Sequence, residues 1–74
     1  MAEVLAWLDL PAGERPRFIT LYMEQYDVAA HAAGTFSPQA VEAMETIDAA
    51  LAKLLGGLDA RGLRADTNLI VLSD

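Results

Sequence analysis

One carboxylate and the only histidine of the chain are spaced as neighbours on one face of a helix would be. Asp27 precedes His31 by four residues, and Val28, Ala29 and Ala30 between them are small, apolar and without competing donor groups. On one helical turn, residues four apart lie about 6 Å from each other, so a carboxylate oxygen and an imidazole nitrogen could converge on one cation. The same spacing also suits a histidine hydrogen-bonded to a carboxylate, and this plainer interpretation stays open beside the metal site.

The acidic balance of the chain limits the partners that it can bind. The 74 residues contain 11 Asp and Glu against five Lys and Arg, the net charge is −6, and cysteine is absent. This charge argues against binding to a nucleic-acid backbone or an anionic membrane surface, and a phosphate substrate would need a cation to meet it. Without thiolates, His31 and the carboxylates are the remaining candidate metal ligands. The opening MAEVLAWLDL is too short and too polar for a signal peptide or a membrane span.

Two apolar runs separated by an amphipathic stretch must position these groups. Residues 18–24, FITLYME, and residues 67–73, TNLIVLS, are rich in β-branched and aromatic side chains and predict two buried strands. Between the runs, apolar residues recur at steps of three and four, which predicts a long helix with one core face. Its start is marked by Ser37 as N-cap and Pro38 at the first helical position, with Phe36 placed to pack against Val41; Gly62 marks its end.

A strand, a long helix and a second strand predict a βαβ unit with parallel strands, and thus an α/β fold. A short helix over residues 2–10 is expected to precede this unit, with Trp7 in the core. In parallel sheets, ligands gather beyond the carboxyl ends of the strands, where Asp27 and His31 follow the first strand and Asp74 ends the second. Taken alone, a carboxylate such as Asp74 more often caps the next helix. Both strands are expected to be buried on two faces, whereas the chain supplies enough helices to cover one face of a sheet. We therefore expect a fragment of a larger sheet.

The run FITLYMEQYDVAAHAAG, residues 18–34, resembles the T-x-Y-x-E-x-x-D-x-x-G-H-x-x-G segment of nucleotide pyrophosphatase/phosphodiesterases in the alkaline phosphatase superfamily. The helix VEAMETIDAALAKLLGGLDARGL and the strand TNLIVLSD resemble the next elements of that family. The resemblance covers essentially the whole chain. It implies that residues 1–74 are a partial catalytic domain, made of helix, strand, metal-ligand loop, long helix and strand, from an alkaline-phosphatase-like parallel-sheet sandwich.

The resemblance also implies a chemistry and a set of ligands. The family uses two zinc ions, and a threonine forms a covalent phospho-enzyme that water then hydrolyses. By resemblance, Asp27 and His31 would bind one zinc and Asp74 the other. No residue here matches the threonine, so the chain is expected to hold no catalytic nucleophile, incomplete zinc sites and no activity of its own.

The implied substrate is a small nucleotide or phosphodiester, and the implied location is periplasmic or secreted. Two positions depart from the family pattern. Ala30 stands where the family has a glycine, which is tolerable at negative φ and costly in the left-handed region. Thr35 replaces a common proline after Gly34. The alternative to a phosphodiesterase fragment is a small acidic, non-catalytic module that binds a protein partner.

Overall fold

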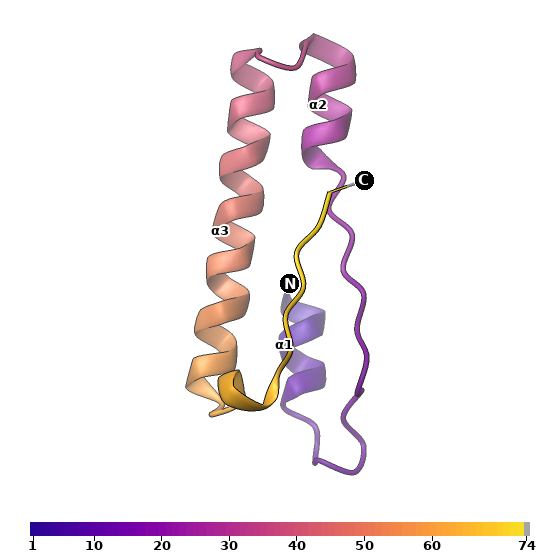
Figure 1. Ribbon diagram of the computed structural model, residues 1–74, viewed down its shortest axis with the longest axis vertical. Helices are drawn as coiled ribbons and strands as arrows, with labels where there is room; N and C mark the ends of the chain where they lie inside the picture. The colour runs from indigo at the N-terminus through magenta and orange to yellow at the C-terminus, as the bar shows by residue number, and fades with distance from the viewer. Residues whose placement is uncertain (74) are drawn as a thin grey trace.

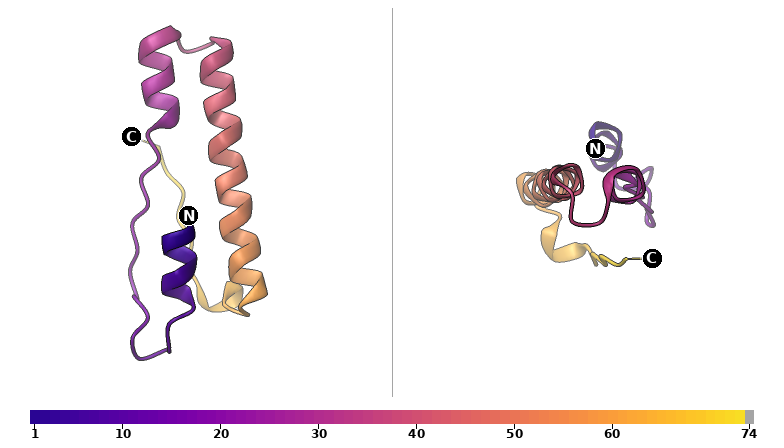
Figure 2. Two further views of the ribbon diagram at one scale, coloured as in Figure 1. Left: turned by 180° about the vertical axis from the view of Figure 1, so that it is seen from behind. Right: turned by 90° about the horizontal axis from the view of Figure 1, so that it is seen from above.

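A computed structural model describes residues 1–73, which fold into a helical arrangement without a sheet. The elements of this part of the chain are α1 (Ala2–Leu8), α2 (Gln25–Ala33), α3 (Pro38–Ala60) and the short 3₁₀ helix η1 (Arg64–Asp66). Helices α2 and α3 form an antiparallel pair, and α1 lies beside the C-terminal half of α3 (Figure 1). Seen from above, α1 and the C-terminal segment lie on opposite sides of this pair (Figure 2).

The long helix begins and ends where the sequence predicts. The Ser37 hydroxyl oxygen accepts a hydrogen bond from the backbone N–H of Ala40 at 3.1 Å, which satisfies one of the free donors of the first turn. After Ala60 the chain turns at Gly62, whose φ of 66° is in the left-handed region that glycine adopts at low cost. The predicted packing of Phe36 on the helix is wrong, because Phe36 is 96% exposed. In residues 1–73 no helix is both long enough and apolar enough to cross a membrane.

The core lies between α1 and the last turns of α3. Val4 and Leu8, one helical turn apart on α1, are buried with Leu54 and Leu58, which have the same spacing on α3. The first helix ends at Leu8, two residues before its predicted end. Trp7 was predicted to pack in this core, but it is 40% exposed, so that prediction is wrong. The face of α1 that carries Val4 and Leu8 makes the contact with α3, and Trp7 lies off that face.

A bidentate ion pair ties the same two helices together. Arg61, which directly follows α3, donates from Nε to Asp9 Oδ1 at 2.7 Å and from Nη2 to Asp9 Oδ2 at 3.0 Å. Its Nη1 also donates to the carbonyl oxygen of Gly57 at 2.9 Å. The hydrogen bond from Arg61 lowers the pKa of the Asp9 carboxyl below its ordinary value. The same hydrogen bond raises the pKa of the Arg61 guanidinium. Asp9 immediately follows α1, so the pair fixes the end of α1 against the end of α3.

The predicted βαβ unit is wrong. Residues 18–24 and 67–73 run as extended chain in the same direction, but no strand or sheet forms within residues 1–73 (Figure 1). Within the same residues no backbone hydrogen bond joins one segment to the other. A strand is defined by the neighbour that accepts and donates its backbone hydrogen bonds, and within residues 1–73 the two extended segments do not serve as that neighbour for each other. Apolar composition therefore predicted the extended conformation correctly, but within residues 1–73 the segments are not joined by the backbone hydrogen bonds that would make them a sheet.

The resulting molecule is open for its size. Its Cα radius of gyration is 14.6 Å and its extents are 44 × 19 × 19 Å, whereas a compact chain of this length has a radius of gyration of about 11 Å. Its accessible surface is 5823 Å², against about 4,400 Å² for a compact monomer of the same mass. Apolar side chains of the extended segments account for part of the difference, because Phe18, Ile70, Val71 and Leu72 are each at least 66% exposed.

Candidate functional site

The segment that carries the candidate ligands is a helix of nine residues, α2, and not the predicted metal-ligand loop. Four of its residues are alanine, which has the most favourable helix propensity of all residues. Asp27 lies in the first turn and His31 in the last, positions where a negative and a protonated side chain respectively complement the helix dipole. Gly34 ends the helix with a φ of 106°. The local sequence therefore forms the helix that the spacing of the two ligands requires.

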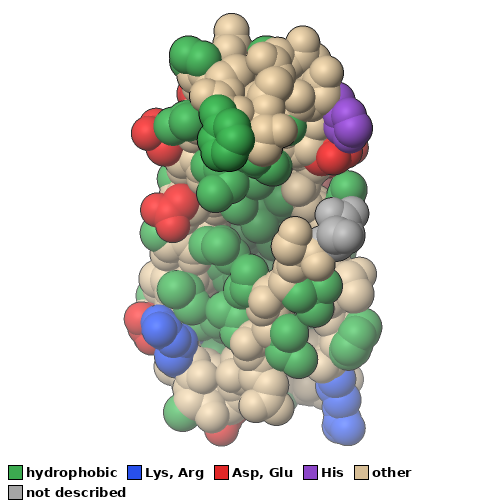
Figure 3. Space-filling view, turned by 45° about the horizontal axis from the view of Figure 1, so that its top comes forward, with side chains coloured by type: hydrophobic (Ala, Val, Ile, Leu, Met, Phe, Trp, Pro, Cys, Tyr) green, Lys and Arg blue, Asp and Glu red, His purple; other side chains and the backbone are tan. Residues whose placement is uncertain are grey.

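Asp27 and His31 are in direct contact on the solvent side of α2. His31 Nε2 lies 3.2 Å from Asp27 Oδ1, and the two side chains are 80% and 63% exposed. The space-filling view shows the histidine against a carboxylate at the edge of the molecule, beside the apolar face (Figure 3). The prediction that these side chains share one face and approach each other is confirmed. Their exposure leaves both open to a ligand from solution.

The separation of the two donor atoms fits one cation between them. Zinc binds imidazole nitrogen and carboxylate oxygen at 2.0–2.2 Å, so two ligand atoms in tetrahedral geometry lie about 3.3 Å apart. The observed 3.2 Å also falls at the long end of the range for a hydrogen bond between nitrogen and oxygen. Both interpretations made from the spacing therefore fit the geometry of the pair.

The rest of a metal coordination shell is not present in the described residues. Within residues 1–73 no group of three or more His, Cys, Asp or Glu side chains lies close enough together to hold a metal ion. Catalytic zinc sites take three protein ligands, and the pair Asp27 and His31 provides two. Asp74, the predicted ligand of the second metal, lies outside the described residues. Ser73, the residue before it, lines the same groove as Asp27, so the second extended segment ends on the side of the molecule that carries the pair.

The departures from the family pattern leave the local geometry intact. Ala30 lies within α2, and glycines are the only described residues with positive φ, so an alanine costs nothing at this position. The carbonyl oxygen of Thr35 accepts a hydrogen bond from the hydroxyl of Tyr26 at 3.2 Å. This contact ties the loop after α2 back to its first turn. The two partners lie nine residues apart, and no pattern in the sequence would have predicted this hydrogen bond.

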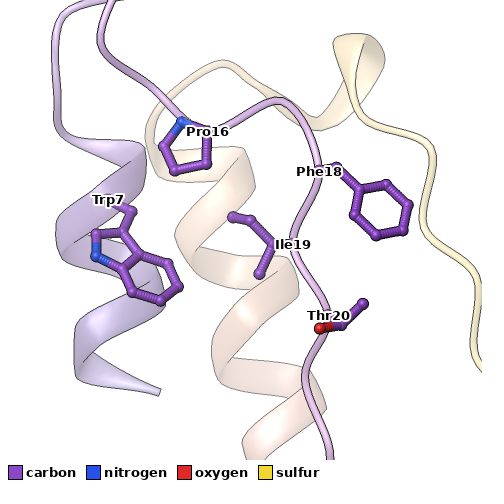
Figure 4. Close-up of a pocket in the computed structure, with 5 residues that line it drawn as sticks. All are labelled: Trp7, Pro16, Phe18, Ile19 and Thr20. Atoms are coloured by element: carbon purple, nitrogen blue, oxygen red, sulfur yellow. The ribbon is translucent and has the colours of Figure 1, made fainter.

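Two hollows accompany the site, and both are lined mainly by apolar residues. A groove of about 1640 Å³ runs between α3 and the two extended segments, and Asp27 lines it with Tyr26 (Figure 3). A smaller pocket of about 300 Å³ lies between α1 and residues 16–20, and it is lined by Trp7, Pro16, Phe18, Ile19 and Thr20. Figure 4 shows that Ile19 points toward Trp7, whereas Phe18 points to the other side of the segment. Among the described residues that line this pocket, none has a titratable side chain.

Comparison with known proteins supports the assignment that the motif suggests. The family model described as type I phosphodiesterase / nucleotide pyrophosphatase matches residues 1–74. The chain is similar to a venom phosphodiesterase of Macrovipera lebetinus, at 45% identity over all 74 residues and 9% of that protein. It is also similar to ectonucleotide pyrophosphatase/phosphodiesterase family member 3 of Rattus norvegicus, at 43% identity over the whole chain and 8% of that protein.

The chain therefore spans less than a tenth of the length of these relatives. No solved structure matches it significantly. The family model covers every residue, and the relatives retain more than two fifths of them over the same span. The chain belongs to the type I phosphodiesterase / nucleotide pyrophosphatase family.

Proposed function

We propose that this chain is a ligand-bearing part of a two-zinc phosphodiesterase or nucleotide pyrophosphatase, which hydrolyses phosphodiester or pyrophosphate bonds of small nucleotide substrates. Asp27 and His31 bind one zinc ion, and Asp74 binds the second. The observation that carries the proposal is the contact of 3.2 Å between His31 Nε2 and Asp27 Oδ1 on one face of α2. Supporting it, the relatives are named phosphodiesterases and pyrophosphatases.

The side chains of the pair suit this role. Asp27 supplies a hard, negative oxygen and His31 a neutral nitrogen, which is the donor set that zinc accepts. Asp27 and His31 would hold the ion, and a zinc ion bound there would supply the positive charge that polarises a phosphoryl oxygen and offsets charge on the leaving oxygen. Because the chain carries a net charge of −6, it repels phosphate and attracts cations, so a metal is needed at the point where substrate meets this surface. The threonine nucleophile of the mechanism lies outside this chain.

The names of the relatives also support a location outside the cell. They are called a venom phosphodiesterase and an ectonucleotide pyrophosphatase/phosphodiesterase. We therefore place the complete enzyme in an extracellular or periplasmic compartment, acting on small-molecule nucleotides rather than on a nucleic-acid backbone.

Zinc titration of the 74-residue chain tests the ligand pair directly. His31 is the only histidine, so its ring resonances report on a single site in an NMR spectrum. We expect zinc to shift or broaden these resonances without saturating at one equivalent, because two protein ligands make a weak site. Calcium at the same concentration is expected to leave them unchanged, since it takes oxygen ligands only.

A matched pair of variants separates a metal site from general attraction of cations. Asp27→Asn is expected to abolish most of the zinc effect on His31. Asp48→Asn removes the same charge from an exposed position on α3 and is expected to leave the effect in place. If both variants weaken the zinc effect equally, the binding is diffuse and the proposed ligand pair is wrong.

The proposal also predicts that the chain alone does not turn over substrate. Without a nucleophile and a third ligand at either metal, a nitrophenyl ester of a nucleoside monophosphate should remain intact in the presence of added zinc. Zinc-dependent release of nitrophenol that Asp27→Ala abolishes would contradict this division of the site between the present chain and the rest of the enzyme.

A further inference from the structure

Tyr26 joins the first turn of α2 to the loop that follows the helix. Its hydroxyl donates a hydrogen bond to the carbonyl oxygen of Thr35 at 3.2 Å, and the residue is half-buried. Asp27, the next residue along the chain, is one of the two candidate zinc ligands and lines the same groove as Tyr26. The tyrosine is therefore tied to the loop from the same helical turn that carries one of the ligands.

The loop that receives this hydrogen bond is a tight turn. The backbone N–H of Ser37 donates to the carbonyl oxygen of Gly34 at 3.1 Å, and the Ser37 hydroxyl donates to the same oxygen at 2.7 Å. Thr35 and Phe36 are the two central residues of this turn, and both have negative φ. Ser37 is also the N-cap of α3. Through the turn, Tyr26 is thus connected to the start of the next helix.

Helix α2 needs such a tie, because its length and its burial hold it weakly. It has nine residues, none of which is buried, and its N-cap Glu24 makes no side-chain hydrogen bond to the first turn. Isolated helices shorter than about 12–15 residues are marginal in water. The contact between Asp27 and His31 depends on this helix, since helical geometry brings residues four apart together. A hydrogen bond that keeps the first turn folded therefore also keeps the two donor atoms together.

We propose that Tyr26 is a positioning residue for the pair Asp27 and His31, and that its hydroxyl keeps α2 in the helical state in which the pair converges. The inference rests on the proposed function, because it gives Tyr26 a role toward the zinc ion that the pair is proposed to bind. Tyr26 does not touch the ion. It raises the fraction of molecules in which both ligands are in place, and the apparent affinity for a ligand is proportional to that fraction.

The test removes the hydroxyl and measures α2 by NMR with and without zinc. Tyr26→Phe keeps the aromatic ring, and Tyr26 lies outside the core cluster, so the fold of the chain is expected to survive. Without metal, the Cα chemical shifts of residues 25–33 should move toward coil values, because the helix opens more often. With zinc, the concentration that gives a fixed change of the His31 ring resonances should rise about two- to tenfold, as expected for the loss of one ordinary hydrogen bond.

Thr46→Val is the matched control. It also removes an exposed hydroxyl that donates to a backbone carbonyl, that of Glu42 at 3.0 Å, but this hydrogen bond lies within α3. The control should match the unmodified chain in both measurements.

Thr35→Pro added to Tyr26→Phe is expected to restore both measurements by stiffening the same turn. Thr35 is the second residue of the turn, a position that favours proline. Gly34 before it has a ψ of 151°, which a following proline permits. Within the described residues the N–H of Thr35 donates no hydrogen bond to the backbone, so proline removes none there.

The outcomes separate this inference from the proposed function. If zinc does not change the His31 resonances of the unmodified chain, the proposed ligand pair is wrong and Tyr26 has no site to position. If zinc changes them and Tyr26→Phe leaves either the α2 shifts or the zinc response as in the unmodified chain, the role of Tyr26 alone is wrong. Equal weakening by Thr46→Val, or no recovery with Thr35→Pro, would overturn it as well.

Discussion

Two adjacent glycines of α3 provide a test of how α1 packs against it. Both Gly56 and Gly57 lie inside the helix, where alanine is favoured over glycine by about 0.8–1.0 kcal/mol. A Cβ at Gly56 would meet no atom within 4 Å, whereas a Cβ at Gly57 would overlap the Cδ2 atom of Leu5 on α1 and lie 3.3 Å from Arg61 Nη1. The two positions thus share the gain in helix propensity and differ in the contact with α1.

Gly56→Ala is expected to stabilise the chain by about 1 kcal/mol, which for a domain of this size corresponds to a rise in Tm of about 4–8 °C. At Gly57 the same gain is offset by overpacking, which costs about 1–3 kcal/mol. Gly57→Ala should therefore change the free energy of unfolding by an amount between zero and a loss of about 2 kcal/mol. The neutral end applies if the half-buried Leu5 side chain can turn away without moving α1.

Thermal unfolding followed by circular dichroism measures both changes. A double-mutant cycle identifies the cause. In a chain that already carries Leu5→Ala, Gly57→Ala should raise the free energy of unfolding by as much as Gly56→Ala does. If Gly57→Ala stabilises the unmodified chain as much as Gly56→Ala does, α1 does not pack on α3 at this point and the reasoning fails.

Two further predictions concern the ends of the helices. Ser37→Ala removes the side-chain cap of α3 and should lower the free energy of unfolding by about 1 kcal/mol in urea titrations; an unchanged midpoint would show that the cap contributes nothing. The pKa of Asp9 is lower in the folded chain than its ordinary value of 3.8, so the stability that this carboxylate contributes is present above pH 3.8 and is lost as the pH falls through the folded-state pKa. Asp9→Asn should therefore have a lower Tm than the unmodified chain at neutral pH, and the gap between the two Tm values should become smaller in acid. A gap that does not change with pH would contradict the role of the pair with Arg61.

The candidate site shows which parts of it could be predicted. The contact between Asp27 and His31 follows from a spacing of four residues in an alanine-rich stretch, since helical geometry alone brings such residues together. The completion of a metal site does not follow from local sequence. It requires ligands from segments far apart in the chain, and within residues 1–73 no third ligand lies beside the pair. Whether the pair holds zinc therefore stays a prediction.

The sequence by itself determined the elements whose interactions are local. The cap at Ser37, the left-handed turn at Gly62 and the amphipathic period of α3 were all predicted correctly, because each depends on residues within one or two helical turns. The apolar runs at residues 18–24 and 67–73 were read correctly as extended chain and wrongly as strands of one sheet. The tertiary structure decided that point, since a strand forms only when another backbone completes its hydrogen bonds, and in residues 1–73 the two runs do not pair with each other. It also decided that Val4 and Leu8 enter the core while Trp7 and Phe36 stay exposed, because burial depends on which faces of distant helices meet.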